Sequence, residues 1–291
     1  MPAETVDVKR AVAFMVLGVA GFSLMDALGK SVVSRHPVFD MLAVRSTVAL
    51  IVLTTVLAAS GRLGTLRTRQ PGGHALRAAC GLVAFVCFYA ALRHLPLADA
   101  VAVAFGAPFL MTALARLILK ERVGVHRWLA IVVGFLGMLV IVKPGGPGFR
   151  PATLLILAAA LAYAVMMLLA RWMTRPERPH EHSSSFVFYM LAGQAVVGWL
   201  VAAPTWHTPD ESGLVQMAAM GVFAILGNYG LAEAFRTAPV AVVAPFEYTG
   251  VIWAVLLGGS VFGETPAPTF WVGAAIIIGA GLFTLRAKVP S

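Results

Sequence analysis

Charged side chains are scarce in this sequence. Aspartate, glutamate, lysine and arginine make up only 12% of its 291 residues, whereas hydrophobic residues make up 59%. A soluble domain usually carries about a quarter charged residues. The scarcity of charge therefore excludes an ordinary soluble domain and indicates an integral membrane protein.

Cysteine is also rare, since only Cys80 and Cys87 occur, both in one apolar segment. A free cysteine in such a segment is usually a buried packing residue. We therefore expect neither a disulfide nor a cysteine metal site.

Motifs for catalysis and nucleotide binding are missing as well. The sequence contains no phosphate-binding glycine loop, no Walker-type lysine and no nucleophile–base arrangement. ATP is therefore not the expected energy source. We expect no catalytic residue, no cofactor and no metal.

Long polar segments are absent too. A membrane-spanning helix needs roughly 20 mostly apolar residues, so ten spans would use about 200 residues and leave room for short connections only. The polar N-terminal segment is followed directly by a full-length apolar run, so we expect no cleaved signal peptide.

The apolar runs that are present predict an all-α integral membrane protein with ten transmembrane helices. The stretch richest in helix breakers, Lys143 to Gly148, is the natural junction between two halves. The predicted helices cover residues 11–33, 39–60, 74–92, 98–119, 126–142, 151–174, 184–203, 213–235, 240–261 and 269–286.

The two halves share landmarks at one constant spacing. Residues in the first half recur in the second 143 positions later (264 − 121 for the glutamates), which predicts a duplicated unit with repeats at residues 1–146 and 147–291. The recurring pairs are Arg93 and Arg236, Pro96 and Pro239, Glu121 and Glu264, and Trp128 and Trp271.

The distribution of cations predicts the orientation. With a cytoplasmic N-terminus, fifteen lysine and arginine residues fall in cytoplasmic segments, five in outer segments and two within helices. Both termini are therefore predicted to lie in the cytoplasm of a multi-pass inner-membrane protein. Because the cations that give the net charge of +9 are scattered at helix ends, we expect no nucleic-acid partner.

Five spans per repeat is an odd number, so the second repeat is predicted to enter the membrane upside down relative to the first. Inverted repeats are a signature of secondary transporters, which carry a solute past a site near the membrane midplane.

Three segments carry a family resemblance: SLMDALGKSVV at residues 23–33, LRHLPLADA with the later LILKERV, and APFEYTGVIWAVLLGGSVFGETP at residues 244–266. They resemble the drug/metabolite transporter superfamily, specifically ten-helix EamA-type exporters with two repeats. Within it, the chain looks most like the bacterial aromatic amino acid exporters. The resemblance implies ten helices around a central cavity, without cofactor or hydrolysis. The family's Gly-Glu stands here as Gly263-Glu264, whereas the first repeat departs from it with Lys120-Glu121.

Ionisable residues inside predicted spans are candidates for a transport site, because charge is costly in a membrane. Asp26 and Lys30 share a helix face at i and i+4 spacing. They form either an internal salt bridge or a cavity wall. Glu247 follows Pro245 in an otherwise uncharged run, where a proline can leave the helix irregular and water-lined, so we expect it to face the cavity.

Arginine can hold a substrate carboxylate with two hydrogen bonds, or it can extend to the membrane interface. Both interpretations remain open for Arg45. We prefer the interfacial one for Arg116, because further cations follow it closely. Glu121 and Glu264 are predicted to lie at helix ends and bind backbone amides there.

A cavity for an aromatic solute needs several aromatic rings and a few polar groups. Pro108 and Pro245 are predicted to kink the two central spans and to act as hinges. The expected cavity residues, besides Asp26, Arg45 and Glu247, are Tyr89, Tyr163, Gln194, Asn228, Tyr229, Tyr248 and Trp253.

Two further patterns have structural interpretations. His180-Glu181-His182 lies in a loop without a partner cluster, so we interpret it as solvated rather than metal-binding. Glycine pairs at Gly18/Gly21, Gly134/Gly137 and Gly273/Gly279 are expected to allow close helix contact.

The sequence thus predicts an exporter of small amphipathic metabolites, with aromatic and hydrophobic amino acids as the substrates that the resemblance suggests. The lipid bilayer is its other partner. An alternative is another small metabolite or a cationic drug. A membrane-embedded enzyme or scaffold is the non-transport alternative, which the inverted duplication disfavours. No helix face indicates an oligomeric state.

Overall fold

The computed structural model describes residues 7–118, 124–144 and 150–286, and within them the chain is entirely helical, without strands. The elements are α1 (Val8–Val33), α2 (Val38–Ala59), η1 (Leu63–Leu66), α3 (Pro71–Leu92), α4 (Leu97–Ala104), α5 (Ala107–Ile118), α6 (Val125–Val142), α7 (Thr153–Met173), α8 (Ser183–Ala202), η2 (Ala203–Thr205), α9 (Glu211–Thr237), α10 (Val240–Val243), η3 (Ala244–Tyr248), α11 (Thr249–Phe262) and α12 (Pro268–Arg286).

These elements confirm the predicted ten-helix membrane architecture. Within the described residues, eight helical segments are long and apolar enough to cross a membrane, and two shorter apolar helices, Trp128–Val142 and Pro268–Phe283, supply the remaining spans. The predicted ends agree with the observed ends within three residues, apart from the two spans that are interrupted.

The fourth and ninth spans, in which the sequence predicted kinks, are each divided into separate helical segments. The fourth consists of α4 and α5 with a break at residues 105–106, just before Pro108. The ninth consists of α10, the 3₁₀ turn η3, which contains Pro245, and α11. Proline has no amide hydrogen and its ring clashes with the carbonyl four residues earlier, so both breaks follow from the sequence.

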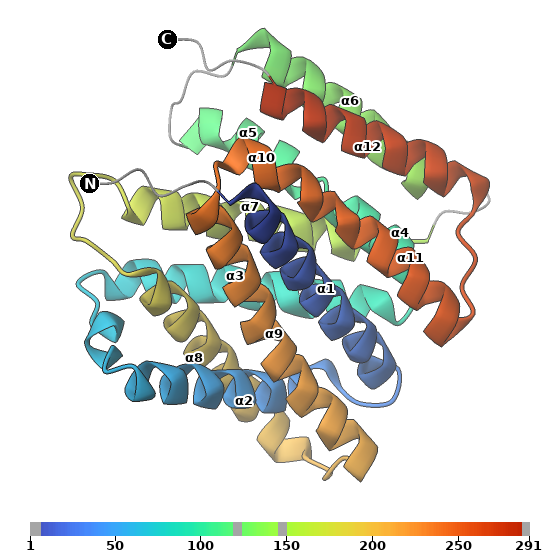
Figure 1. Cartoon of the computed structure of the whole chain (residues 1–291). Coiled ribbons are helices and arrows are strands. Elements are labelled where there is room, and N and C mark those ends of the chain that lie inside the picture. Colours follow the sequence, from blue (N-terminus) through green and yellow to red (C-terminus); the bar gives the residue numbers. More distant parts are fainter. Residues whose placement is uncertain (1–6, 119–123, 145–149, 287–291) are drawn as a thin grey trace.

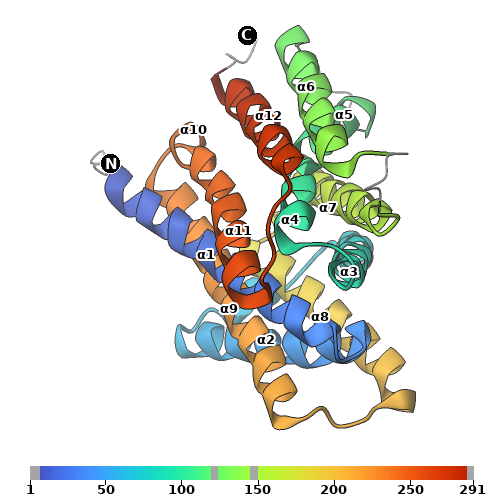
Figure 2. The ribbon, with the colours of Figure 1, turned by 90° about the vertical axis from the view of Figure 1, so that its right-hand side faces the viewer.

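The helices of the two halves pack in an exchanged pattern. The first helix of each half lies along the third helix of the other, α1 against α9 and α7 against α3, while α2 pairs with α8 and α6 with α12 (Figure 1). The α6–α12 pair lies at the opposite end of the bundle from α2 (Figure 2). Such an exchange is what two copies related by a pseudo-two-fold axis produce. The predicted repeat boundary at 146/147 and Glu121 lie outside the described residues.

Glycine allows the closest of these contacts. A Cβ atom on Gly230 of α9 would lie 2.7 Å from the Cα atom of Gly18 in α1. A Cβ on Gly273 of α12 would lie 2.6 Å from the carbonyl oxygen of Gly137 in α6. Gly279 is different, because its Cβ would meet nothing within 4 Å, so the expectation of close contact is wrong there.

Candidate functional site

A buried polar group joins α2 and α8. One guanidinium nitrogen of Arg45 donates to Oε1 of Gln194 over 3.1 Å, and Nε2 of Gln194 donates to the carbonyl oxygen of Gly81 over 3.2 Å. Arg45 is only 6% exposed and Gln194 only 3%. Arg45 therefore does not extend to a membrane interface, so the interfacial interpretation is wrong, and a role in holding a substrate carboxylate stays a prediction. Arg116, in contrast, is exposed.

The guanidinium of Arg45 is incompletely bonded. It lies over the ring of Phe85 at 4.7 Å and reaches the sulfur of Met25 at 3.8 Å. Its Nε atom is buried without a hydrogen-bond partner, and Arg45 forms no ion pair within the part of the chain that the structure describes. A buried cation in this state has donors to spare for a ligand.

Asp26 of α1 is hydrogen-bonded to Tyr89 of α3. The hydroxyl of Tyr89 donates to its carboxylate over 2.9 Å, and the charge of Arg45 acts on it. Tyr89 is stacked against Phe85 with ring centroids 4.4 Å apart. It can lie against α1 because residue 29 is glycine, on which a Cβ would come within 2.1 Å of the Tyr89 ring. We call Asp26, Arg45, Tyr89 and Gln194 the Arg45 site. It lies roughly two helical turns inside the ends of α1 and α2.

Lys30 does not pair with Asp26, so the salt bridge considered from their i and i+4 spacing is wrong. Its ammonium group forms an ion pair with Glu264 and also donates to the carbonyl oxygen of Leu95. The second carboxylate oxygen of Glu264 accepts from the amide of Leu97 at the start of α4 over 2.8 Å. This confirms that Glu264 binds a helix-end amide. We call the contacts among Lys30, Glu264, Leu95 and Leu97 the outer clasp, after the predicted outer side.

Glu247 and Tyr248 belong to a second group, around the broken ninth span. Glu247 is half-buried in η3, whereas Tyr163 of α7 is 46% exposed, so a role of Tyr163 in the site stays a prediction. Its carboxylate makes no hydrogen bond or ion pair to any described residue. Tyr248 lies against Phe105 at the break in the fourth span, with ring centroids 5.3 Å apart. The two interrupted spans therefore meet at these aromatic rings.

Three other candidates join neither group. Asn228 donates to the Ala224 carbonyl of its own helix over 2.7 Å, and Tyr229 is 56% exposed. Trp253 packs against the apolar contact between α1 and α9. A role in the site stays a prediction for these three residues.

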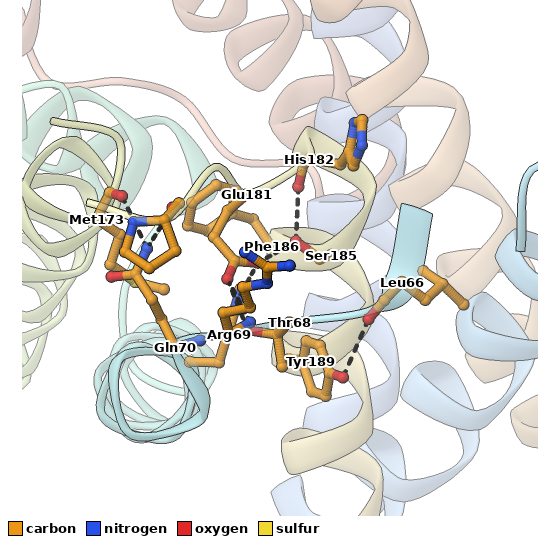
Figure 3. A network of polar contacts seen from close by, with 12 residues as sticks. Leu66, Thr68, Arg69, Gln70, Met173, Glu181, His182, Ser185, Phe186 and Tyr189 are labelled. Carbon is orange, nitrogen blue, oxygen red and sulfur yellow. Dashed lines mark hydrogen bonds and ion pairs between the residues drawn. The ribbon is translucent and has the colours of Figure 1, made fainter. Parts of the chain in front are cut away.

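A polar network around Glu181 joins the connection before α3 to the connection before α8, and the sequence did not predict it. The interpretation of Glu181 as solvated is wrong. Glu181 is 5% exposed and accepts from Thr68 Oγ1 over 2.8 Å and from the Arg69 amide over 2.9 Å (Figure 3). Its other oxygen lies 3.2 Å from His74 Nε2 and 3.2 Å from Ser185 Oγ. Burial raises the pKa of Glu181, but the hydrogen bonds from Arg69, Thr68 and His74 outweigh it and lower the pKa overall.

This network ties two connections together. Gln70, just before α3, donates to the carbonyl oxygens of Met173 and Pro179 over 3.0 and 2.8 Å, and Tyr189 donates to that of Leu66 over 3.0 Å (Figure 3). The sequence signal was the spacing of Gln70, His74 and Arg77, which places the N-cap residue of α3 and two polar residues of that helix on one side. Among the described residues, no group of three or more His, Cys, Asp or Glu could hold a metal ion.

Comparison with known proteins identifies the family of this chain. The profile of the EamA-like transporter family matches residues 9–143 and, separately, residues 150–286. The chain belongs to the EamA-like transporter family. The two matches lie on either side of the predicted repeat junction.

Several EamA relatives resemble the chain along most of its length. A riboflavin transporter of Vibrio cholerae is 29% identical, over 91% of this chain and 89% of its own. An S-adenosylmethionine uptake transporter of Rickettsia conorii is 27% identical, over 95% and 92%. A pseudopaline exporter of Pseudomonas aeruginosa is 31% identical, over 96% and 97%.

A known crystal structure shares the EamA chain's fold. It superposes with a TM-score of 0.65 over 94% of this chain and 96% of its own, at 20% identity, which shows the fold alone. The narrower resemblance to aromatic amino acid exporters is not supported by the three relatives, which are named for other solutes.

Proposed function

We propose that this EamA transporter carries a small amphipathic metabolite through the Arg45 site by alternating access. The observation that carries the proposal is the buried and incompletely bonded guanidinium of Arg45, placed within the electrostatic reach of Asp26. Ionisable groups inside a membrane protein are expensive and usually mark a solute or ion pathway.

The chemistry of the Arg45 site favours a solute with an aromatic ring and a polar or zwitterionic group. Arg45 offers donors to a carboxylate or carbonyl oxygen, and Asp26 offers an acceptor to an ammonium or amide group. Phe85 and Tyr89 supply aromatic surface beside them. A buried arginine favours an anionic group on the solute over a simple cationic drug.

Two classes of solute meet these requirements. Aromatic and hydrophobic amino acids carry an ammonium group and a carboxylate, and the aromatic ones also carry a ring. Riboflavin and S-adenosylmethionine, for which two relatives are named, combine a larger heteroaromatic ring with polar groups. Another metabolite of this kind is therefore the stronger alternative to an amino acid. Because one relative is named for uptake and another for export, export rests on the sequence resemblance alone.

Alternating access requires that the contacts at one end break while those at the other form. The outer clasp joins α1, the α3–α4 turn and the connection after α11, and the Glu181 network holds the other end. The breaks at Pro108 and Pro245 supply positions where the fourth and ninth spans can bend. We place the protein in the inner membrane, with both termini cytoplasmic and no cofactor, catalytic residue or metal.

Counterflow tests this function. Liposomes containing purified protein are preloaded with one unlabelled solute and then given the same solute in labelled form outside. The panel is riboflavin, S-adenosylmethionine, phenylalanine and tryptophan. We expect transient accumulation above protein-free liposomes for at least one of them. A folded, inserted protein that accumulates none would contradict the proposed class of solute.

A further inference from the structure

A cavity with a polar lining borders the outer clasp. Its volume is about 210 Å³, and it is lined by residues at the start of α4, the end of α6, the start of α7 and the start of α12. Its polar lining consists of Asp99, Lys143, Arg150, Thr153 and Thr269. We call it the outer cavity. None of these residues belongs to the Arg45 site.

The outer cavity borders the clasp directly. Leu95 lines the cavity, and its carbonyl oxygen accepts a hydrogen bond from Lys30. Asp99 follows in the first turn of α4, whose first amide binds Glu264. The clasp therefore separates the outer cavity from Asp26, which lies one turn before Lys30 on α1.

The charges in the cavity are not paired with one another. Asp99, Lys143 and Arg150 line the same cavity, yet no ion pair joins Asp99 to either cation in the described part of the chain. Arg150 uses one guanidinium nitrogen to donate to the His94 carbonyl over 2.9 Å. One acceptor and two cationic donors thus line the same space with bonding capacity left for a ligand.

The backbone at Lys143 also departs from the usual pattern. Lys143 ends α6 in the left-handed conformation, with φ 48° and ψ 58°, and is the only described residue other than glycine with positive φ. Glycine or asparagine is the usual residue at such a helix end. Strained backbone of this kind is concentrated at functional positions. A lysine here places a cation at the cavity despite that cost.

We propose that the outer cavity is a second solute site, which binds the zwitterionic head group of an α-amino acid on the far side of the clasp from the Arg45 site. The ammonium group contacts Asp99, and the carboxylate contacts Lys143 and Arg150. Pockets for whole drug-sized ligands usually measure about 300–1,000 Å³, so a cavity of this size fits a head group. The inference rests on the proposed transport function and assigns an additional site to it.

Solutes with and without an α-amino acid head group should differ in binding to the outer cavity. Phenylalanine and S-adenosylmethionine both carry an α-ammonium and a carboxylate group. Riboflavin carries neither. The two amino acids should therefore occupy the outer cavity, and riboflavin should not, whichever of the three is transported.

Ligand protection of an introduced thiol tests the site. Thr269→Cys is placed at the cavity in a Cys80→Ser/Cys87→Ser background, and its reaction with a membrane-impermeant maleimide is timed in cells and in inverted vesicles. We expect phenylalanine and S-adenosylmethionine to slow labelling, and riboflavin to leave it unchanged. Asp99→Asn should weaken protection about tenfold, the loss typical of one charged hydrogen bond. Lys143→Asn should weaken protection to a similar extent, because it removes the ammonium group. Asparagine is chosen because it tolerates the left-handed backbone at this position.

The same labelling test in an Arg45→Gln protein distinguishes binding at the outer cavity from transport through the Arg45 site. In an Arg45→Gln protein, the rate of counterflow should fall at least about tenfold while protection of Thr269→Cys by the amino acids persists. If the amino acids no longer protect Thr269→Cys in the Arg45→Gln protein, the protection comes from binding at the Arg45 site. The outer cavity would then not be a separate site. Equal protection by riboflavin, or none by either amino acid in a folded protein, would also overturn it.

Discussion

Lys30 pairs with Glu264, 234 residues later in the chain, and not with Asp26 one turn away on the same helix. The ion pair ties α1 to the connection after α11, while Asp26 is left to bind Tyr89. Because both partners are largely buried, with side chains 12% and 19% exposed, the pair is shielded from solvent. One helix thus carries both a clasp residue and a site residue.

The clasp should depend on opposite charges. Lys30→Glu should lower stability, because an unpaired buried partner typically costs about 1–3 kcal/mol. Lys30→Glu combined with Glu264→Lys should recover part of this loss. Recovery should be incomplete, since lysine cannot accept from the Leu97 amide. Thermal unfolding in detergent measures the effect. A double variant no more stable than Lys30→Glu alone would contradict the pairing.

Glu247 should be needed for transport rather than for folding. Its carboxylate is half-buried without a partner among the described residues, so Glu247→Gln removes a charge that stabilises no described contact. We expect the initial rate of counterflow to fall while expression and thermal stability stay near wild type. Glu211→Gln, at the exposed start of α9, is the matched control. Wild-type transport by Glu247→Gln would remove this residue from the pathway.

The prolines at the broken spans should set the rate of turnover. Pro108→Ala and Pro245→Ala restore an amide donor and favour a continuous helix. Each should slow counterflow without reducing stability. Pro204→Ala, in the exposed turn η2, should leave the rate unchanged. If all three variants turn over at the same rate, the hinge assignment is wrong.

The Glu181 network should stabilise the fold in a pH-dependent manner. The folded-state pKa of Glu181 lies below its ordinary value of 4.5. The ionised carboxylate therefore stabilises the fold above that value, and the stabilisation is lost as the pH falls through the folded-state pKa. Glu181→Gln should lower thermal stability at pH 7, and the difference from wild type should shrink as the pH is lowered below 4.5.

Glu177→Gln is the control for the Glu181 variant, since Glu177 lies in the same connection with its side chain 66% exposed. It should have little effect on stability at either pH. A Glu181→Gln protein whose loss of stability is the same at both pH values would show that the ionised carboxylate is not the stabilising species.

The spans could be predicted from the sequence because each is a run of about 20 apolar residues, a strong local signal. The breaks in the fourth and ninth spans had a signal in Pro108 and Pro245, but proline indicates a weak point without fixing which residues leave the helix. The Gly-Glu of the second repeat likewise indicated that Glu264 binds a helix end, which it does at Leu97.

The wrong assignments concern partners that are distant in sequence. Helical spacing places Asp26 and Lys30 on one face, but it cannot show that Glu264 competes for the ammonium group. Glu181 lies in a polar loop, and only the fold brings the segment around Thr68 over it to exclude water. Local pattern thus predicts elements and faces, whereas the bonding of buried polar groups is decided by tertiary packing.

The central claim is that solute passes through the Arg45 site, and one variant tests it most directly. Counterflow of the best solute from the panel is compared between wild type, Arg45→Gln and Arg67→Gln, the last at an exposed arginine. We expect Arg45→Gln to lose at least about tenfold in rate, as for one charged hydrogen bond, and Arg67→Gln to match wild type. A folded Arg45→Gln protein that transports at the wild-type rate would contradict the account.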